Sequence, residues 1–304
     1  MTTEKIFDEA LKNILSEDEI LKDEPMKHHT TFRVGGPAEY YLRPKKEQVA
    51  EVLRLCLTYQ KEYLIIGNGS NLLVSDKGIS GVVIEIGKQM DEITVDGTTI
   101  YAQAGAMLSK TAHAALEAGL TGMEFAAGIP GCVGGAVVMN AGAYGGEMKD
   151  ILKSVTVLTA DGQEKELTPG ELDMSYRHSS ITEEHYMVLG VTIALEAGSQ
   201  EQIRAKMEEL KEKRVEKQPL EYPSAGSTFK RPEGYFAGKL IMDAGLRGFQ
   251  VGGAAVSEKH CGFVINRGNA TAADVRTLMQ NVADIVEEKF GVRLEPEVKM
   301  IGEF

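Results

Sequence analysis

Two glycine-rich stretches hold the residues whose types and spacing are best suited to bind a charged ligand. Residues 128–146 read GIPGCVGGAVVMNAGAYGG, in which seven of nineteen residues are glycine, several times the ordinary usage of about 7%. Residues 67–76 read GNGSNLLVSD and follow an apolar run, Tyr63–Ile66. Glycines turn through positive φ, and their N–H groups can form a nest for an anion such as a pyrophosphate. A buried structural loop is the alternative for one such stretch, but two in one chain favour a nucleotide.

Neither stretch matches a common nucleotide-binding motif. A Walker A sequence ends in Gly-Lys-Ser/Thr and the dinucleotide fingerprint reads G-x-G-x-x-G, and both are missing from these two stretches. We therefore expect any nucleotide to be held in a non-Rossmann way.

Three side chains outside these stretches are candidates for chemistry. Arg177, in SYRHS (residues 175–179), offers a permanently charged fork that suits a carboxylate or an enolate oxygen. Ser227, in PSAGSTFK (residues 223–230), lacks the G-x-S-x-G context of a hydrolase serine. Glu297, in LEPEV (residues 294–298), shares a strand face with Glu295. Alone, these residues fit a surface arginine, a turn serine and an exposed carboxylate.

Together these motifs resemble a known family. The two glycine stretches are similar to the flavin loops of the UDP-N-acetylenolpyruvoylglucosamine reductases (the MurB family), and the match extends from Thr30 to the C-terminus. The resemblance implies an α+β fold, with an FAD-binding domain of the vanillyl-alcohol oxidase/PCMH type made of two α+β subdomains. A smaller α+β substrate-binding domain follows it.

The resemblance also implies an activity. The family reduces the enolpyruvyl ether of UDP-N-acetylglucosamine to the lactyl ether, UDP-N-acetylmuramate, with hydride from NADPH delivered through FAD, for cell-wall synthesis. Arg177 and Glu297 would stabilise the resulting enol, and Ser227 would protonate the adjacent carbon. Ser227 matches the family better than Ser224 because it follows Ala-Gly and precedes Phe-Lys, and Glu297 matches better than Glu295 because it follows the proline.

The resemblance assigns a non-covalent FAD to the glycine stretches. The cofactor-binding residues that it implies are Gly67, Asn68, Gly69, Ser70, Asn71, Leu72, Gly128, Ile129, Pro130, Gly131, Val133, Gly134, Gly135, Asn140, Gly142, Ala143 and Tyr144. We expect Gly128, Gly131, Gly134 and Gly135 to supply the positive φ angles. The segment TTFRVGG (residues 30–36) lies near the flavin in the family.

Substrate anchors follow less directly from the resemblance. Tyr176, Lys217, Lys230 and Arg231 are the candidates. Lys217 precedes Gln-Pro as a diphosphate-binding lysine does in the family, and the alternative is that it ends a helix in solvent. Arg231 stands where some members carry Asn, so the family's uridine contacts do not transfer to it. In one branch of the family, a tyrosine-bearing loop closes over the substrate, and this chain lacks that loop between Arg177 and Ser227. The chain therefore resembles the shorter, second type, and the sequence does not identify the element that closes over the substrate.

These residues need a scaffold, and hydrophobic periodicity predicts one. Helices are expected at residues 47–62, with Val49, Val52, Leu53, Cys56 and Leu57 inward, and at 108–120, 200–217, 236–244 and 272–289. Strands are expected at 63–66, 82–86, 93–95, 98–102, 154–159, 165–167, 187–195, 250–256, 262–265 and 292–301, with Asp-Gly turns at 96–97 and 161–162. Residues 1–29 are interpreted as a peripheral N-terminal helix and linker, 30–198 as the FAD-binding domain and 199–304 as the substrate-binding domain.

Composition limits the classes of partner. A formal charge of −12 and a pI near 5.1 argue against binding to nucleic acid or an anionic membrane. The N-terminus does not read as a signal peptide, and no apolar run approaches the roughly 18 residues of a membrane span. Three cysteines and six histidines show no ligand spacing, so no metal or disulfide framework is expected. We predict a cytoplasmic monomer or weak homo-oligomer that binds a nucleotide-sugar and NADPH.

Two rival functions stay open at the level of the sequence. One is an FAD-dependent oxidase on the same fold, which would use oxygen instead of NADPH. The other is a non-catalytic nucleotide-sugar binder that reuses the glycine loops.

Overall fold

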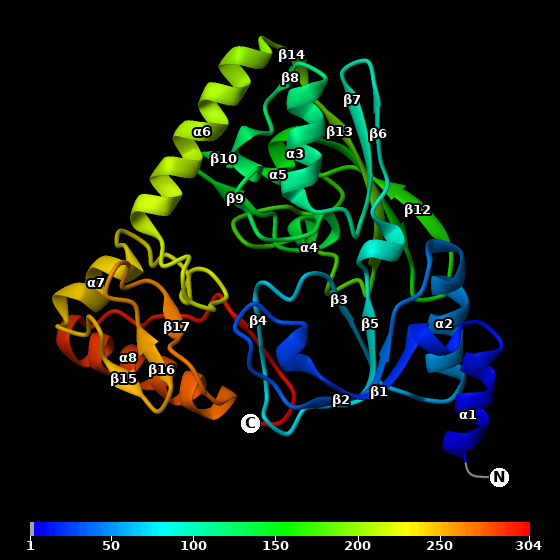
Figure 1. Ribbon diagram of the computed structural model, residues 1–304, viewed down its shortest axis with the longest axis horizontal. Coiled ribbons are helices and arrows are strands. Elements are labelled where there is room, and N and C mark those ends of the chain that lie inside the picture. Colours follow the sequence, from blue (N-terminus) through cyan, green and yellow to red (C-terminus); the bar gives the residue numbers. More distant parts are fainter. Residues whose placement is uncertain (1–2) are drawn as a thin grey trace. The chain divides into compact units, whose positions relative to one another are not determined.

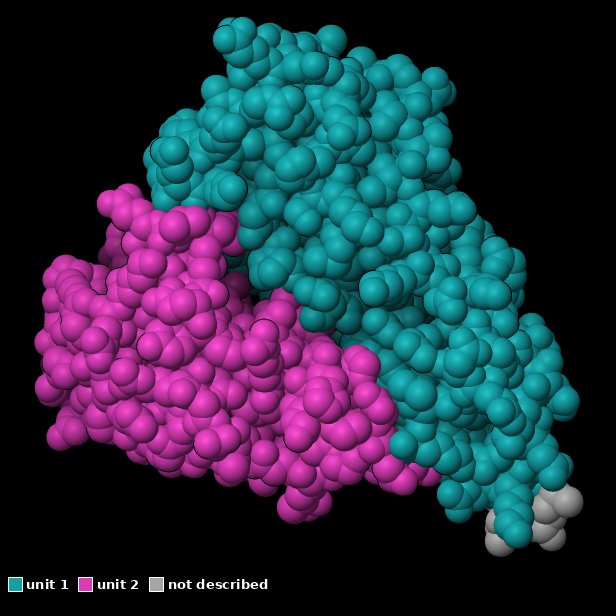
Figure 2. Space-filling view, in the orientation of Figure 1, with its two compact units in different colours: residues 1–22, 40–68, 81–213 teal, residues 23–39, 69–80, 214–304 magenta. Residues whose placement is uncertain are grey.

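The computed structural model describes residues 3–304, which form two compact units (Figure 2). Unit 1 contains the chain up to Lys22, Tyr40–Asn68 and Gly81–Lys213, and unit 2 contains Asp23–Glu39, Gly69–Ser80 and Arg214–Phe304. Each unit therefore gathers segments that are distant in the sequence. The boundaries proposed above at residues 29/30 and 198/199 stay a prediction about folding domains.

The larger sheet of unit 1 is antiparallel throughout. Its strands follow the order β12-β11-β13-β7-β6, with bounds β6 Ile93–Asp96, β7 Thr99–Gln103, β11 Leu152–Leu158, β12 Glu164–Leu167 and β13 Met187–Ala194. Both predicted Asp-Gly hairpins are present, and Gly97 has the positive φ (57°) that such a turn requires. The strand predicted at 187–195 is β13, which is hydrogen-bonded to β11 on one edge and to β7 on the other.

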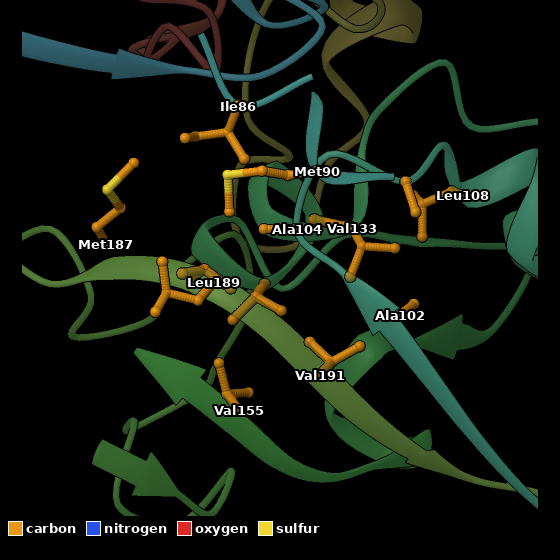
Figure 3. Close-up of a cluster of buried hydrophobic side chains, with 14 of the residues drawn as sticks. Ile86, Met90, Ala102, Ala104, Leu108, Val133, Val155, Met187, Leu189 and Val191 are labelled. Atoms are coloured by element: carbon orange, nitrogen blue, oxygen red, sulfur yellow. The ribbon is translucent and has the colours of Figure 1, made fainter. Parts of the chain in front are cut away.

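Short helices of unit 1 cover this sheet (Figure 1). They are α3 Leu108–Glu117, α4 Val133–Val138 and α5 Met148–Ile151. Helix α4 packs on β13 and β7, and Figure 3 shows its Val133 in a buried cluster with Leu189 and Val191 of β13. Helix α3 confirms the prediction at 108–120, and Gly119 (φ 69°) follows its end.

A second sheet has the strand order β1-β2-β5-β3. Its strands are β1 Ile20–Pro25, β2 Pro37–Leu42, β3 Tyr63–Ile66 and β5 Ile79–Glu85. Strand β3 is parallel to β5, and residues 67–78, which include the first glycine stretch, form the crossover connection between them. Helices α1 Thr3–Lys12 and α2 Lys46–Thr58 pack together. Strands β1 and β2 were not predicted. In β1, the three consecutive charged residues Lys22, Asp23 and Glu24 leave no apolar alternation.

The structure corrects two predictions about these helices. Phe7 and Leu11 of α1 are fully buried in the core of unit 1, so the helix is not peripheral. Helix α2 ends at Thr58 instead of residue 62, and Leu57, expected inward, is 51% exposed.

Unit 2 is built on helix α8, Ala272–Phe290. It packs on α7 Ala237–Asp243 and on the three-stranded sheet of β15 Gln250–Val251, β16 Ala254–Val256 and β17 Val264–Asn266. Thr271 caps α8, since its hydroxyl accepts from the Asp274 N–H at 3.0 Å. The carboxylate of Asp76, from the end of the first glycine stretch, accepts from the N–H groups of Ala272 and Ala273 at 2.8 and 2.9 Å.

The remaining elements are short, except for helix α6, Gln200–Lys217, which has the predicted bounds. Strand β4 Leu72–Val74 pairs in parallel with β18 Lys299–Ile301. Of the long strand predicted at 292–301, only these last three residues form a strand. Strand β8 Leu120–Thr121 pairs with β14 Glu196–Ala197, and β9 Gly142–Ala143 pairs with β10 Gly146–Glu147. Among the described residues, no helix is long and apolar enough to cross a membrane.

Candidate functional site

The two glycine stretches contact one another in unit 1. Asn68, directly after β3, donates from Nδ2 to the carbonyl of Pro130 at 2.7 Å across 62 residues of sequence. A Cβ on Gly67 would lie 2.1 Å from the Sγ of Cys132, so only glycine permits this approach. The structure thus brings together two motifs that the sequence assigned to one nucleotide.

The segment between β7 and α3 holds the second stretch in place. The carbonyl of Gly131 accepts from Leu108 N–H at 2.9 Å, and the N–H groups of Val133 and Gly134 donate to the carbonyls of Ala106 and Ala104 at 2.8 and 2.7 Å. A Cβ on Gly134 would lie 2.9 Å from the Cβ of Ala104. Gly134 is therefore required for packing within the protein.

The second stretch differs from the expected open loop. Gly134 and Gly135 are helical residues of α4, and the positive φ angles fall instead on Asn140 (40°), Tyr144 (53°) and Gly145 (91°). Among the described residues, a Cβ on Gly135 would meet within 4 Å only the Cys132 sulfur, at an ordinary 3.6 Å. Glycine inside a helix costs about 1 kcal/mol, and an exposed glycine that packing does not require fits the close approach of a ligand.

Arg177 lies at the tip of a tight turn in unit 1. Ser175 and His178 exchange two backbone hydrogen bonds of 3.1 Å, and Arg177 takes a left-handed φ of 56°. Its guanidinium donates from Nη2 to the carbonyl of Gly142 at 3.4 Å and lies 5.0 Å from the centre of the Tyr176 ring. The arginine is thus held against the second glycine stretch.

Asn140 connects that stretch to the arginine turn. It is fully buried, and its amide nitrogen donates to the carbonyl of Ser175 and to the carboxylate of Glu147, both at 2.9 Å. Its amide oxygen accepts from Lys149 N–H at 3.0 Å, and the Ser179 hydroxyl donates to the carbonyl of Val138 at 2.9 Å. These contacts connect both ends of the Arg177 turn to residues 138–149, and they occupy the Asn140 side chain, which the sequence assigned to the cofactor, with protein partners.

Ser227 and Glu297 lie on paired segments of unit 2. Phe229 and Pro296 form an antiparallel bridge, and the N–H of Glu297 donates to the carbonyl of Thr228 at 2.8 Å. Asn71, from the first glycine stretch, donates from Nδ2 to the carbonyl of Glu297 at 3.1 Å. Ser227 is exposed and follows Gly226 (φ 75°). A serine hydroxyl, a carboxyl and part of the first glycine stretch are therefore neighbours within one unit.

The structure distinguishes the two glutamates that strand alternation could not. The Glu295 side chain is 69% exposed, and its carboxylate lies 3.2 Å from the ammonium of Lys230. Glu297 is half-buried and has its backbone held on both sides. This difference supports Glu297 as the functional carboxyl. Lys230, a candidate substrate anchor, forms an exposed ion pair with Glu295.

Two other candidate substrate anchors, Lys217 and Arg231, lie at separate places in unit 2. Lys217 ends α6, where the Lys259 ammonium donates to the carbonyl of Val215 at 2.7 Å. The guanidinium of Arg231 lies 4.0 Å from the centre of the Phe236 ring, and its Nε donates to the carbonyl of Tyr235 at 3.3 Å.

His260 is a residue that the sequence reasoning missed. Its Nδ1 accepts from Gly262 N–H at 3.1 Å, and burial, with a smaller contribution from the charge of Lys217, lowers its pKa. A Cβ on Gly262 would lie 3.0 Å from the ring. The spacing His-x-Gly was the available signal.

The site offers backbone and hydroxyl groups to a ligand. Among the residues that the structure describes, no group of three or more His, Cys, Asp or Glu could hold a metal ion. The cysteines are free and buried, and burial raises the pKa of Cys56 to about 12. The Thr31 hydroxyl is buried without a hydrogen-bond partner, and its N–H donates to the carbonyl of Gly69 in the first glycine stretch. A hydroxyl donor in this position fits a cofactor oxygen.

Comparisons with known proteins agree with this geometry. A family model of the UDP-N-acetylenolpyruvoylglucosamine reductase C-terminal domain matches residues 218–301, and an FAD binding domain model matches residues 38–168. A UDP-N-acetylenolpyruvoylglucosamine reductase of Agathobacter rectalis is 60% identical over 297 residues, covering 94% of this chain and 95% of that protein. One of Geobacillus thermodenitrificans is 52% identical over 296 residues, covering 97% of each.

Solved structures give the same picture. The UDP-N-acetylenolpyruvylglucosamine reductase (MurB) from Thermus caldophilus is 37% identical with a TM-score of 0.79, covering 91% of this chain and 97% of that chain. A p-cresol methylhydroxylase with substrate bound is 15% identical with a TM-score of 0.51, covering 64% and 44%, and shows similarity of fold alone. The predicted fold class, an α+β FAD-binding domain of the PCMH type followed by a smaller α+β domain, is confirmed.

Proposed function

The chain belongs to the UDP-N-acetylenolpyruvoylglucosamine reductase family, and from this premise we propose how its residues perform the family's reaction. It is an FAD-dependent oxidoreductase that uses NADPH to reduce the enolpyruvyl ether of UDP-N-acetylglucosamine to UDP-N-acetylmuramate, a precursor of peptidoglycan. When bound, FAD supplies the hydride chemistry, and the protein supplies orientation and charge.

Arg177 binds the developing negative charge of the substrate. Hydride addition to the terminal vinyl carbon leaves negative charge on the adjacent carbon, which is delocalised onto the two oxygens of the attached carboxyl group. A guanidinium can donate to both of these oxygens in its fixed plane. The contacts to Gly142 and Tyr176 support this role, because they fix the fork before the substrate arrives.

Ser227 donates the proton that completes the product. The exposed hydroxyl gives its proton to the carbon beside the carboxylate, and solvent returns one. Glu297 donates a hydrogen bond to the substrate carboxyl and so favours the enol. The pairing of residues 227–230 with residues 295–298, with Asn71 bonded to Glu297, is the observation that carries this assignment.

An anaerobic visible spectrum tests the function. The purified protein is expected to be yellow, to bleach with NADPH and to regain colour with the enolpyruvyl substrate. A colourless protein that binds the nucleotide-sugar would instead favour the non-catalytic alternative. A coloured protein that ignores NADPH would favour the oxidase.

The finer setting of the reaction is also a proposal. Tyr176, Lys217, Lys230 and Arg231 anchor the nucleotide-sugar, and the enzyme works in the cytoplasm as a monomer or weak homo-oligomer. The acidic charge of −12 supports small-molecule partners over nucleic acid or membrane. Light scattering of the purified protein measures the oligomeric state.

A further inference from the structure

The hydroxyl of Thr31 is an unsatisfied polar group in an otherwise satisfied interior. Among the residues that the structure describes, its Oγ1 is the buried side-chain oxygen or nitrogen without a hydrogen-bond partner. A buried hydroxyl that has lost water and gained no partner lowers the stability of the protein, so such groups are rare and call for a physical cause.

Hydrogen bonds and burial fix the chain on both sides of Thr31. The Thr30 hydroxyl donates to the carbonyl of Val34 at 3.0 Å, and the N–H of Arg33 donates to the carbonyl of Thr30 at 3.1 Å. The next residue, Phe32, is fully buried, and its carbonyl accepts from the Asn266 amide at 3.1 Å. The backbone that carries the unsatisfied hydroxyl is therefore held by its neighbours on both sides.

The same turn lies against the first glycine stretch. Thr31 N–H donates to the carbonyl of Gly69 at 3.3 Å. Gly69 has a φ of 59°, and a Cβ there would lie 2.0 Å from the carbonyl oxygen of His29, so only glycine lets the two segments approach. A ligand held by this stretch lies within reach of the Thr31 side chain.

We propose that the Thr31 hydroxyl donates a hydrogen bond to an oxygen of the FAD that residues 67–72 hold. The inference rests on the proposed function, which supplies the FAD. A hydroxyl can donate to the phosphate and ribityl oxygens that a dinucleotide presents, and a charged phosphate oxygen makes the stronger bond. Thr31 thus contributes to cofactor affinity and contributes nothing to the stability of the FAD-free fold.

Two variants at this position test the proposal. Thr31→Val replaces the hydroxyl with a methyl group of similar size, and Thr31→Ser keeps the hydroxyl. FAD release from each holoprotein is followed by flavin fluorescence after dilution. We expect about tenfold weaker retention in Thr31→Val, the worth of one hydrogen bond, and retention near the unchanged protein in Thr31→Ser.

Thr30→Val is the matched control, because the neighbouring hydroxyl already has a partner. Thermal unfolding with and without FAD should show Thr30→Val destabilised in both states. Thr31→Val should be destabilised only with FAD and equal or more stable without it. Equal FAD retention in Thr31→Val, or equal destabilisation in both states, would overturn the proposal by placing a water or protein partner at the hydroxyl. If the unchanged protein binds no FAD at all, it is the proposed function that fails.

Discussion

At the scale of single residues, Ser227 separates the two halves of the reaction. Since its proposed proton transfer follows hydride delivery, Ser227→Ala should leave flavin reduction by NADPH nearly unchanged. Reoxidation by the enolpyruvyl substrate should slow by about 10²-fold or more, the usual worth of a positioned general acid. Stopped-flow measurement of each half-reaction checks this. Equal slowing of both half-reactions, or of neither, would contradict the role.

Glu297 and Glu295 form a natural pair for comparison. Glu297→Gln should lower the turnover by about 10²-fold, because the amide cannot replace the carboxyl in the enol-forming step. Glu295→Gln removes an exposed ion pair to Lys230, which is worth about 0–1 kcal/mol, and should leave turnover near its starting value. Steady-state rates of the two variants decide between them, and the reverse order would assign the role to Glu295.

His260 makes stability depend on pH. Burial, with the charge of Lys217, lowers its pKa below the ordinary 6.5, so the unfolded chain binds a proton first as the pH falls. Its contribution to stability is complete above about pH 6.5 and is lost progressively below it. His260→Asn keeps an acceptor for the Gly262 N–H, and its unfolding midpoint in urea should fall less between pH 7 and pH 5. Parallel curves for both proteins would exclude the histidine as the source.

At the scale of elements, Asp76 connects the first glycine stretch to α8. Its carboxylate accepts from the N–H groups of Ala272 and Ala273, where a negative charge also interacts favourably with the helix dipole. Asp76→Ala should lower the free energy of unfolding by about 1–2 kcal/mol. Asp284→Ala, on an exposed turn of the same helix, is the control and should change it by less than about 0.5 kcal/mol. A urea titration of both variants tests this.

Elements with strong local signals were predictable from the sequence. Helix α8 has a capping threonine and an apolar face, on which Val275, Leu278, Val282 and Val286 are buried. The Asp-Gly hairpins were equally clear. Helix α4 was missed because its glycines have low helix propensity, and contacts with Ala104 and β13 outweigh that preference.

The candidate site was predictable only as separate motifs. The sequence gives no local signal that residues 227–230 pair with residues 295–298, or that Asn140 connects the second glycine stretch to Ser175. Such contacts depend on the complete fold. The family resemblance selected the residues, and the structure supplies the contacts that hold them.

At the scale of the whole molecule, we propose that NADPH and the nucleotide-sugar react in turn at one site. The chain carries no G-x-G-x-x-G unit for a second dinucleotide, and both substrates must bring a carbon to the same flavin. We therefore expect ping-pong kinetics, with parallel initial-rate plots and inhibition by excess substrate. Deuteride from labelled NADPH should appear on the new methyl group of the product. Intersecting plots would indicate a ternary complex and a separate nicotinamide site.

The composition of unit 2 has a consequence for synthesis on the ribosome. Asn71 precedes its partner Glu297 by 226 residues, and β4 precedes β18 by a similar length. At the usual rates of translation, the nascent first glycine stretch waits on the order of 10 to 45 s before these partners exist. During that interval the apolar strand β4 has no neighbour from the C-terminal segment, so the newborn chain is exposed to wrong pairing and to chaperones at the place that will later hold its cofactor.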